Sequence, residues 1–507
     1  MTPISPRQAG RRPGVRVTLA TLLGLVAGST SGCFAAAQEG AGPGSGAGGT
    51  LRLALPWAPA AAYSPYSDDG VLLSRLGATE SLTRLDESGA PAPVLAESWE
   101  QVDARTWRFE LRPGVAFQDG TTLTAEDVVR SLDAAAAATP VPSEISSVEL
   151  TTTAVDEDTV EIVTSVADPV LPQRLSSPNL PVLAAAAFDG KDVEAARHGT
   201  GPFAVTATRG AQGATLEAHD AYWDGEPALD GLEVRYTPDA AARVAAFEAG
   251  EVDVAHTVAA ADVAGLGGEL LEMPLPRSVL VYLNSNREAL DEPGERAFVA
   301  DAVDQELLAG TVFEDHADPA TGLFGPATPW AQSRPALPEP EASVKPDETV
   351  RIATYTERPE LAPVADAVAA ELREAGVEVE QVVRPYTGLE PALLAGEFDV
   401  VVGSRSYAVD TGEPVDYLLS DFGCRGSYNL AHLCDRDVEK VLEDLQGQPD
   451  IESRREAVLA AEHAVLATGA VVPVVHERAR HAVSDSVSGL ATDPFERLLV
   501  TAGTSLR

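Results

Sequence analysis

The sequence predicts an α/β protein built from more than one unit, and three observations support this prediction. Strand and helix signals follow one another in the order β-β-β-α-β between residues 198 and 256, and a separate alternation of strands and helices begins at residue 350. A chain of 507 residues is also long enough for two or three domains with a large core. The second alternation predicts a unit with a mainly parallel sheet.

The first 50 residues predict a targeting signal followed by a flexible tether, and no folded structure. Four arginines precede the apolar run 17–27, which is too short to span a bilayer stably, so 1–32 is predicted to be a signal peptide. Ser31-Gly32-Cys33 resembles the bacterial lipobox, in which the cysteine carries lipid, although Thr30 replaces the usual Leu. Residues 33–50 are rich in Gly and Ala and predict a flexible tether to a membrane.

Net charge disfavours nucleic-acid binding, and the cysteine count predicts one disulfide. With 45% apolar residues and 22% charged residues the composition is that of a soluble globular chain, and a net charge of −42 disfavours binding to DNA, RNA or an anionic lipid surface. Of the three cysteines, Cys424 and Cys434 remain as an even pair once Cys33 is assigned to lipid. Outside the cytoplasm such a pair predicts a disulfide, worth roughly 2–3 kcal/mol by restricting the unfolded chain.

The elements before residue 200 have clear local signals. We expect a strand at 51–55, a loop over 56–69, a helix that leads into a short strand and turn within 71–88, and a half-buried strand near 106–112. Thr124 reads as the N-cap of a helix with acids in its first turn. Further strands are expected within 148–163, followed by a Pro-rich connection over 168–186.

The stretch 198–256 is the most regular part of the chain. Strands are expected at 202–208, 214–218 and 232–236, with turns at 209–213 and 224–227. A helix opens at Thr237-Pro238-Asp239 and ends at Gly250, and a strand resumes at 252–255. This order of strands and helix predicts a compact fold but does not by itself indicate a chemical function.

After residue 276 the sequence predicts strands alternating with helices. Strands are expected at 277–284, 350–354, 377–383, 398–402 and 471–476, and helices at 295–308, 361–375, 389–395, 435–445 and 452–468. Residues 315–347 are rich in Pro and Asp and predict a long surface loop with a little structure. The tail to residue 507 returns to strands and loops.

Short sequence motifs in two blocks of the chain resemble those of extracellular solute-binding protein family 5, which contains the peptide- and nickel-binding receptors of ABC importers. The first block comprises 199–203 (GTGPF), 220–225 (DAYWDG), 237–239 (TPD) and 248–253 (EAGEVD). The second comprises 93–99 (PVLAESW), 106–120 (TWRFELRPGVAFQDG) and 124–128 (TAEDV). The resemblance spans residues 51–490, and the aromatic residues of the second block are expected to be scaffold.

The resemblance implies a two-lobe periplasmic-binding-protein-like fold with a hinge between the lobes and an extra subdomain in the first lobe. We expect lobe 1 at 51–276 with the subdomain at about 82–190, lobe 2 at 277–475, and a return to lobe 1 at 476–507. The hinge crossings are predicted near 277–284 and 472–478, and closure would trap a solute and present a changed surface to the permease subunits.

The resemblance also suggests ligand-binding residues. Counting back from Cys424, Asp410 occupies the position of the carboxylate that holds a peptide's α-ammonium, and Tyr407 stands where the family usually has Trp. An acid on a solvated loop is the alternative reading of Asp410. Candidate residues that line the cleft elsewhere are Tyr66, Arg425, Tyr428 and Asn429.

The function that follows is a lipid-anchored extracytoplasmic receptor that captures an oligopeptide or dipeptide for an ABC transporter, with no cofactor and no catalysis. One alternative keeps the fold and changes the solute to nickel or a metal chelate, with His256, His432 and His476 as possible ligands, although structural or surface roles are commoner for such residues. A second alternative is a secreted hydrolase. The chain lacks His-Glu-x-x-His and Gly-x-Ser-x-Gly, and acids such as Glu126-Asp127 are explained by a helix start.

Overall fold

The computed structural model of the protein describes residues 48–507 apart from 337–341 and 409–410. The predicted signal peptide (1–32), Cys33 and all of the predicted tether before residue 48 lie outside the described residues. Among the helices of the described part, none combines the length and apolar character that a membrane crossing requires.

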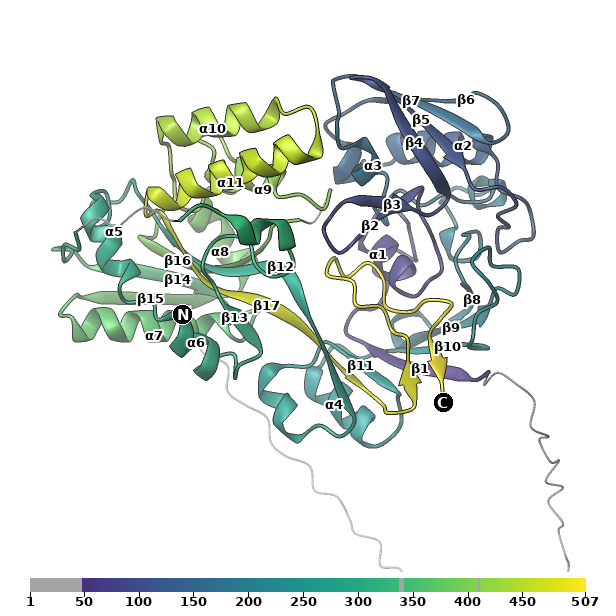
Figure 1. Ribbon diagram of the computed structural model, residues 1–507. Coiled ribbons are helices and arrows are strands. Elements are labelled where there is room, and N and C mark those ends of the chain that lie inside the picture. Colours follow the sequence, from purple (N-terminus) through teal and green to yellow (C-terminus); the bar gives the residue numbers. More distant parts are fainter. Residues whose placement is uncertain (1–47, 337–341, 409–410) are drawn as a thin grey trace, which may run out of the picture. The chain divides into compact units, whose positions relative to one another are not determined.

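Most strands join one sheet. Its members are β1 (Thr50–Leu55), β8 (Phe203–Thr208), β9 (Gly213–Ala218), β10 (Gly231–Tyr236), β11 (Val254–His256), β12 (Glu269–Leu283), β13 (Ala317–Pro319), β14 (Val350–Tyr355), β15 (Val379–Arg384), β16 (Val400–Ser406) and β17 (Val471–Val483). The order is β15-β14-β16-β12-β17-β11-β1-β10-β9-β8, with β13 paired to β17 (Figure 1). The predicted strands at 51–55, 202–208, 214–218, 232–236 and 350–354 are therefore confirmed.

The two long strands β12 and β17 connect the halves of this sheet. They pair antiparallel along their length, but the register shifts between Pro274 and Ser278. Proline cannot donate a ladder hydrogen bond, so a bulge here follows from the Pro274-Leu275-Pro276 sequence. The regular pairing of the two crossing strands is thus interrupted between the lobes, next to the predicted crossings at 277–284 and 472–478. The predicted domain bounds themselves stay predictions.

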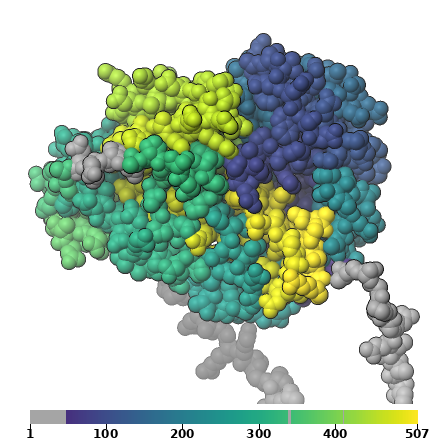
Figure 2. Space-filling view, in the orientation of Figure 1, coloured from purple at the N-terminus to yellow at the C-terminus, as the bar shows by residue number. Residues whose placement is uncertain are grey.

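In the first lobe, β1 pairs parallel with β10 and β11. Two helices flank this part of the sheet, α1 (Asp68–Arg75) and α4 (Ala240–Glu248), and the Asp239 side chain caps α4 by accepting from Ala242 N–H at 2.8 Å. The tail after β17, yellow in Figure 2, packs here: Leu499 N–H donates to Arg75 O at 3.2 Å, and β18 (Val487–Ser488) pairs with β19 (Ser505–Leu506).

The subdomain has its own sheet and core. Its strands are β4 (Ala96–Asp103), β5 (Thr106–Leu111), β6 (Leu150–Ala154) and β7 (Thr159–Thr164) in the order β4-β5-β7-β6, beside α2 (Ala125–Ala136), α3 (Leu171–Arg174) and the pair β2 (Thr83–Leu85) and β3 (Pro91–Pro93). Thr124 caps α2 as predicted, in a capping box with Asp127. Phe109, Phe117 and Val128 are fully buried in this core.

The second lobe surrounds β14, which pairs parallel with β15 and β16 as the alternation predicts, whereas β16 pairs antiparallel with β12. Its helices are α5 (Pro293–Ala300), α6 (Gln305–Thr311), α7 (Leu361–Glu374), α8 (Tyr386–Leu394), α9 (Val415–Phe422), α10 (Arg436–Gln446) and α11 (Ile451–Ala467).

Two predictions for this lobe are wrong. The single helix expected at 295–308 is two helices, because the Asp304 side chain accepts from Leu307 N–H at 2.9 Å and starts a new helix. The segment 315–347 has a little structure, as expected, including β13, but it does not stay on the surface, because Leu323 and Phe324 have no exposed surface in the lobe's core.

Candidate functional site

A cavity of about 700 Å³ lies between the lobes. On the first-lobe side its wall includes Trp57, just after β1, and Thr257, just after β11. On the second-lobe side it includes Arg358, after β14, and Arg405, near the end of β16. The paired strands β1 and β11, and β14 and β16, are parallel, so all four residues stand at carboxyl ends of parallel strands. That edge is where open α/β sheets bind ligands, and the volume is that of a small-molecule site.

The charged residues of the wall reverse the balance of the whole chain. Acids outnumber Lys and Arg by 78 to 36 in the sequence. The cavity wall instead carries six arginines and four glutamates, namely Arg243, Arg277, Arg358, Arg405, Arg478 and Arg480 with Glu357, Glu360, Glu477 and Glu496. A solute with both negative and positive groups would find partners of both signs here.

The centre of the wall is a loose charge network around Glu477. Arg358 Nη1 lies 3.3 Å and Arg277 Nε 3.8 Å from its carboxylate, and Ser404 Oγ donates to it at 3.2 Å. The Arg358 side chain is 36% exposed and that of Arg277 25%. Each arginine therefore keeps donors that its protein partner does not use.

One corner of the wall is held tightly. Arg405 binds Asp421 through two hydrogen bonds, Nε to Oδ2 at 2.7 Å and Nη2 to Oδ1 at 2.6 Å, and its guanidinium lies 4.2 Å from the centre of the Tyr428 ring. Burial lowers the pKa of Arg405, but the hydrogen bonds with Asp421 outweigh it and leave the pKa raised. Arg405 is thus a permanent cation fixed in position.

Aromatic rings complete the wall. Tyr355 meets Tyr386 edge-on with ring centres 5.2 Å apart, and the Tyr386 hydroxyl donates to the Tyr428 hydroxyl at 3.1 Å. Burial raises the pKa of Tyr428, so its hydroxyl stays protonated. Opposite, Trp57 is 52% exposed, and the Arg75 guanidinium lies 5.4 Å from the centre of its ring. Exposed Trp of this size at a cavity rim is a ready stacking surface for a ligand.

The sequence matches the family described as bacterial extracellular solute-binding proteins, family 5 Middle, over residues 90–429. The chain belongs to this family. Its members are extracytoplasmic receptors that bind a substrate. The two-lobe α/β fold predicted from the resemblance is confirmed.

Relatives and solved structures agree with this assignment. The chain is 27% identical to "Probable di/tripeptide-binding protein 5" of Pseudomonas aeruginosa over 81% of this chain and 86% of the relative. It is 25% identical to the nickel-binding protein NikA of Staphylococcus aureus over 68% of this chain and 71% of that protein. A crystal structure of a nickel ABC transporter protein from Bacillus halodurans has the same fold, with a TM-score of 0.78, 23% identity and coverage of 90% of this chain and all of that one.

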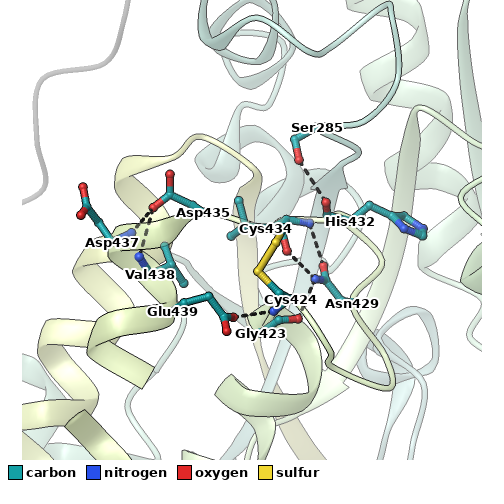
Figure 3. Close-up of a disulfide and its surroundings, with 11 residues drawn as sticks. Ser285, Gly423, Cys424, Asn429, His432, Cys434, Asp435, Asp437, Val438 and Glu439 are labelled. Carbon is teal, nitrogen blue, oxygen red and sulfur yellow. Dashed lines mark hydrogen bonds between the residues drawn. A yellow bond between two sulfur atoms is a disulfide. The ribbon is translucent and has the colours of Figure 1, made fainter. Parts of the chain in front are cut away.

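The predicted disulfide between Cys424 and Cys434 is present (Figure 3). Glu439 of α10 accepts from Cys424 N–H at 2.5 Å, and Asn429 crosses the loop by donating to Gly423 O and Leu433 O. The predicted ligand residue Asn429 is therefore engaged in holding the loop. The same loop carries Tyr428, which lines the cavity, and Arg425, which is exposed.

The other predicted ligand residues lie apart from the large cavity. Tyr66 packs against the subdomain core, and burial raises its pKa to about 12. Tyr407 is 2% exposed, and its hydroxyl accepts from Gly325 N–H at 3.0 Å; burial raises its pKa to about 12. Tyr407 and Ser406 line a separate cavity of about 320 Å³, and Ser406 and Ala408 line another of about 270 Å³. Asp410 lies outside the described residues. No observation tests ligand contact by these residues, and it stays a prediction.

The three histidines considered as metal ligands are not gathered. His256 stacks on His481 with ring centres 4.2 Å apart, His476 shares a hydrogen bond with Ser278 at 2.8 Å, and the His432 ring lies against Gly396. Burial lowers the pKa of His476 to about 4. Within the described residues there is no group of three His, Cys, Asp or Glu that could hold a metal ion.

The cavity arginines and glutamates were not among the predicted site residues. Arg277, Glu477 and Arg478 lie at the predicted crossings, and Arg358 lies in the loop after the predicted strand at 350–354. For Arg358 the available signal was its position after a predicted strand, because the carboxyl ends of parallel strands converge on one edge. Arg277 and Glu477 lie within the long antiparallel strands β12 and β17, where this signal does not apply.

Proposed function

We propose that this chain is the solute-binding receptor of an ABC importer and that it captures a small peptide, a dipeptide or short oligopeptide, in the cavity between its lobes. The relative named as a di/tripeptide-binding protein supports this solute class. Peptides bring a cationic amine, an anionic carboxylate and side chains of varied shape.

The observation that carries the proposal is the mixed charge of the cavity beside aromatic rings. Glu357 and Glu360 are available to an ammonium, Arg358 and Arg277 to a carboxylate, and Trp57 to an apolar side chain. Charge-assisted hydrogen bonds of both signs inside a closed cleft are the stronger kind. Asp410 remains our candidate for the ammonium partner on the basis of its sequence position.

The remaining parts of the proposal concern anchoring and delivery. Lipid on Cys33 would hold the receptor at the outer side of the membrane, and closure of the lobes would present the loaded form to the permease subunits. The solute is released unchanged, because the receptor's task is to select it by differential contacts in the closed state.

Calorimetry on protein purified without refolding tests the solute class. We expect binding of Ala-Ala and Ala-Ala-Ala at micromolar or lower Kd, with quenching or enhancement of tryptophan fluorescence that the Trp57→Phe variant reduces. Native mass spectrometry of the same preparation should reveal a co-purified peptide that survives intact. Shortened products from a mixed peptide pool would instead indicate hydrolysis.

Nickel or a nickel chelate is the second candidate, favoured by the nickel-binding relative and by arginines able to hold a chelator's carboxylates. Tight binding of Ni²⁺ or of the nickel complex of histidine, with no response to either peptide, would replace the peptide by a chelate as the solute.

A further inference from the structure

The cleft contains two cavities side by side that share part of their walls. The larger, of about 700 Å³, is the candidate site described above. The smaller, of about 270 Å³, extends toward α1 and the end of β16, where Arg75, Ser406 and Ala408 form part of its wall. Leu275, Arg277 and Glu496 line both cavities and so stand between them.

The polar part of this boundary is a long ion pair. Arg277 Nη2 lies 3.9 Å from Glu496 Oε2, which exceeds the length of a hydrogen bond, and the two side chains are 25% and 23% exposed. Arg277 is also shared with Glu477 at 3.8 Å. Partly exposed pairs of this length contribute little energy, so the two side chains are free to part.

The backbone that carries Glu496 is, by contrast, fixed. Its carbonyl accepts two hydrogen bonds from Arg75, at 3.0 Å from Nε and 2.6 Å from Nη2. The Asp493 carboxylate accepts from Phe495 N–H at 2.9 Å and Arg497 N–H at 2.7 Å, which closes the turn. Glu496 has a φ of 55°, a conformation that favours glycine, yet a large charged side chain stands there. A fixed backbone with a movable side chain is the construction of a gate.

We propose that the Arg277–Glu496 pair is a partition that sets the length of peptide this receptor accepts. With the pair in place, a bound peptide is confined to one cavity. A longer peptide, which gains about 3.5 Å for each extended residue, must displace the pair to enter the second cavity. Removing the Glu496 side chain joins the two cavities and favours longer peptides. This inference rests on the proposed peptide-binding function.

The test measures Kd by calorimetry for alanine peptides of two to five residues, and its readout is the ratio of the dipeptide Kd to the pentapeptide Kd. Glu496→Gly removes the side chain and suits the positive φ, so its fold is expected to survive, as a thermal melt will verify. Glu496→Gln keeps the volume and removes the charge. Glu269→Ala removes the same charge from an exposed position on β12, outside both cavities, and is the matched control.

We expect Glu496→Gly to shift the ratio at least tenfold toward the pentapeptide, Glu496→Gln to shift it less than threefold, and Glu269→Ala to leave it unchanged. An unaltered ratio in Glu496→Gly, with dipeptide bound by both proteins, overturns the partition but leaves the peptide receptor standing. Failure of the unmodified protein to bind any alanine peptide overturns the proposed function and the partition together. A shift of equal size in Glu496→Gln overturns the steric gate in favour of simple charge removal.

Discussion

Two arginines on the same wall of the cavity have opposite surroundings. Arg405, whose side chain is 28% exposed, makes two hydrogen bonds to the fully buried carboxylate of Asp421, and its guanidinium lies 4.2 Å from the centre of the Tyr428 ring. Among the described residues, the Arg358 side chain has one ion-pair partner, Glu477 at 3.3 Å, and 36% of the side chain is exposed. Arg405 therefore holds a buried carboxylate through two short hydrogen bonds, whereas Arg358 makes one longer contact with the partly exposed Glu477.

This difference separates scaffold from recognition within a single cavity. A carboxylate as buried as that of Asp421 needs its paired cation, and removal of the cation leaves the carboxylate unpaired in a medium of low dielectric constant. A half-exposed charge with unused donors contributes little to the fold and is free to bind a solute. We therefore expect the Arg405 corner to govern stability and the Glu477 centre to govern affinity.

The largest effect is expected for Arg405→Ala, which leaves the Asp421 carboxylate buried without its cation. The free energy of unfolding should fall by about 3–5 kcal/mol, as for other broken buried pairs. Urea unfolding measures this, and Arg358→Ala, with an expected loss below about 1 kcal/mol, is the matched control. The double replacement Arg405→Met with Asp421→Leu should recover most of the loss. Equal losses in the two single variants would erase the proposed distinction.

Acid should lower the free energy of unfolding through His476, which lies on β17 next to Glu477. His476 of β17 is 3% exposed, and burial lowers its pKa from 6.5 to about 4, with Arg334 adding to the effect and Asp318 opposing it. Because the unfolded chain binds the proton first, this contribution is complete above pH 6.5 and is lost as pH falls toward 4. The slope is about 1.4 kcal/mol per pH unit, or about 3 kcal/mol in total.

Urea unfolding at pH 7, 5.5 and 4.5 checks this, with His476→Asn as the variant because its amide can also bond Ser278. The variant should lose less stability on acidification than the unmodified protein. Parallel pH dependences in the two proteins would show that His476 is protonated equally in the folded and unfolded chains.

The disulfide helps to position the Arg405 corner of the cavity, since Tyr428, which contacts Arg405, lies in the loop that the disulfide closes. Replacing Cys424 and Cys434 by Ser should lower the free energy of unfolding by about 2–3 kcal/mol, as expected for a loop of this length. Guanidinium unfolding without reductant gives the value, and reductant added to the unmodified protein should reproduce it. Insensitivity to both treatments would mean that the loop is held by the hydrogen bonds that Asn429 donates and the one that Glu439 accepts.

Elements with strong local signals were predictable from the sequence. Thr124 and Asp239 each precede a helix with a side chain that caps it, and short-range chemistry of this kind needs no tertiary information. The split of 295–308 was missed because Asp304 reads equally well as a surface residue within one helix. The burial of Phe324 was missed because its segment is rich in Pro and Asp, and only the packed lobe shows that it turns inward.

The candidate site was less accessible to sequence reasoning. Arg277, Arg358, Arg405 and Glu477 come from four distant segments, and the folded sheet brings them to the wall of one cavity. Tyr407 illustrates the second difficulty. Tyr407 follows the end of β16 and lines a cavity of about 320 Å³ that is distinct from the large one, and no local signal in the sequence tells which cavity a residue at this strand end faces.

The smallest expected change is in the affinity for peptide, and it tests the Glu477 centre directly. Arg358→Ala should weaken binding of Ala-Ala about tenfold, equivalent to about 1.4 kcal/mol, because a half-exposed guanidinium loses its charge-assisted bonds to the peptide carboxylate while Glu477 keeps Arg277 and Ser404. Calorimetry at 20 mM and 200 mM NaCl measures the change. Arg358→Lys, which retains charge but not the planar fork, should recover only part of it. The control ligand is the amide of Ala-Ala, which lacks the carboxylate, and the readout is the Kd of Arg358→Ala divided by the Kd of the unmodified protein. If this ratio is the same for the amide and for Ala-Ala, the guanidinium recognises something other than the carboxylate. The division between corner and centre would then rest on stability alone.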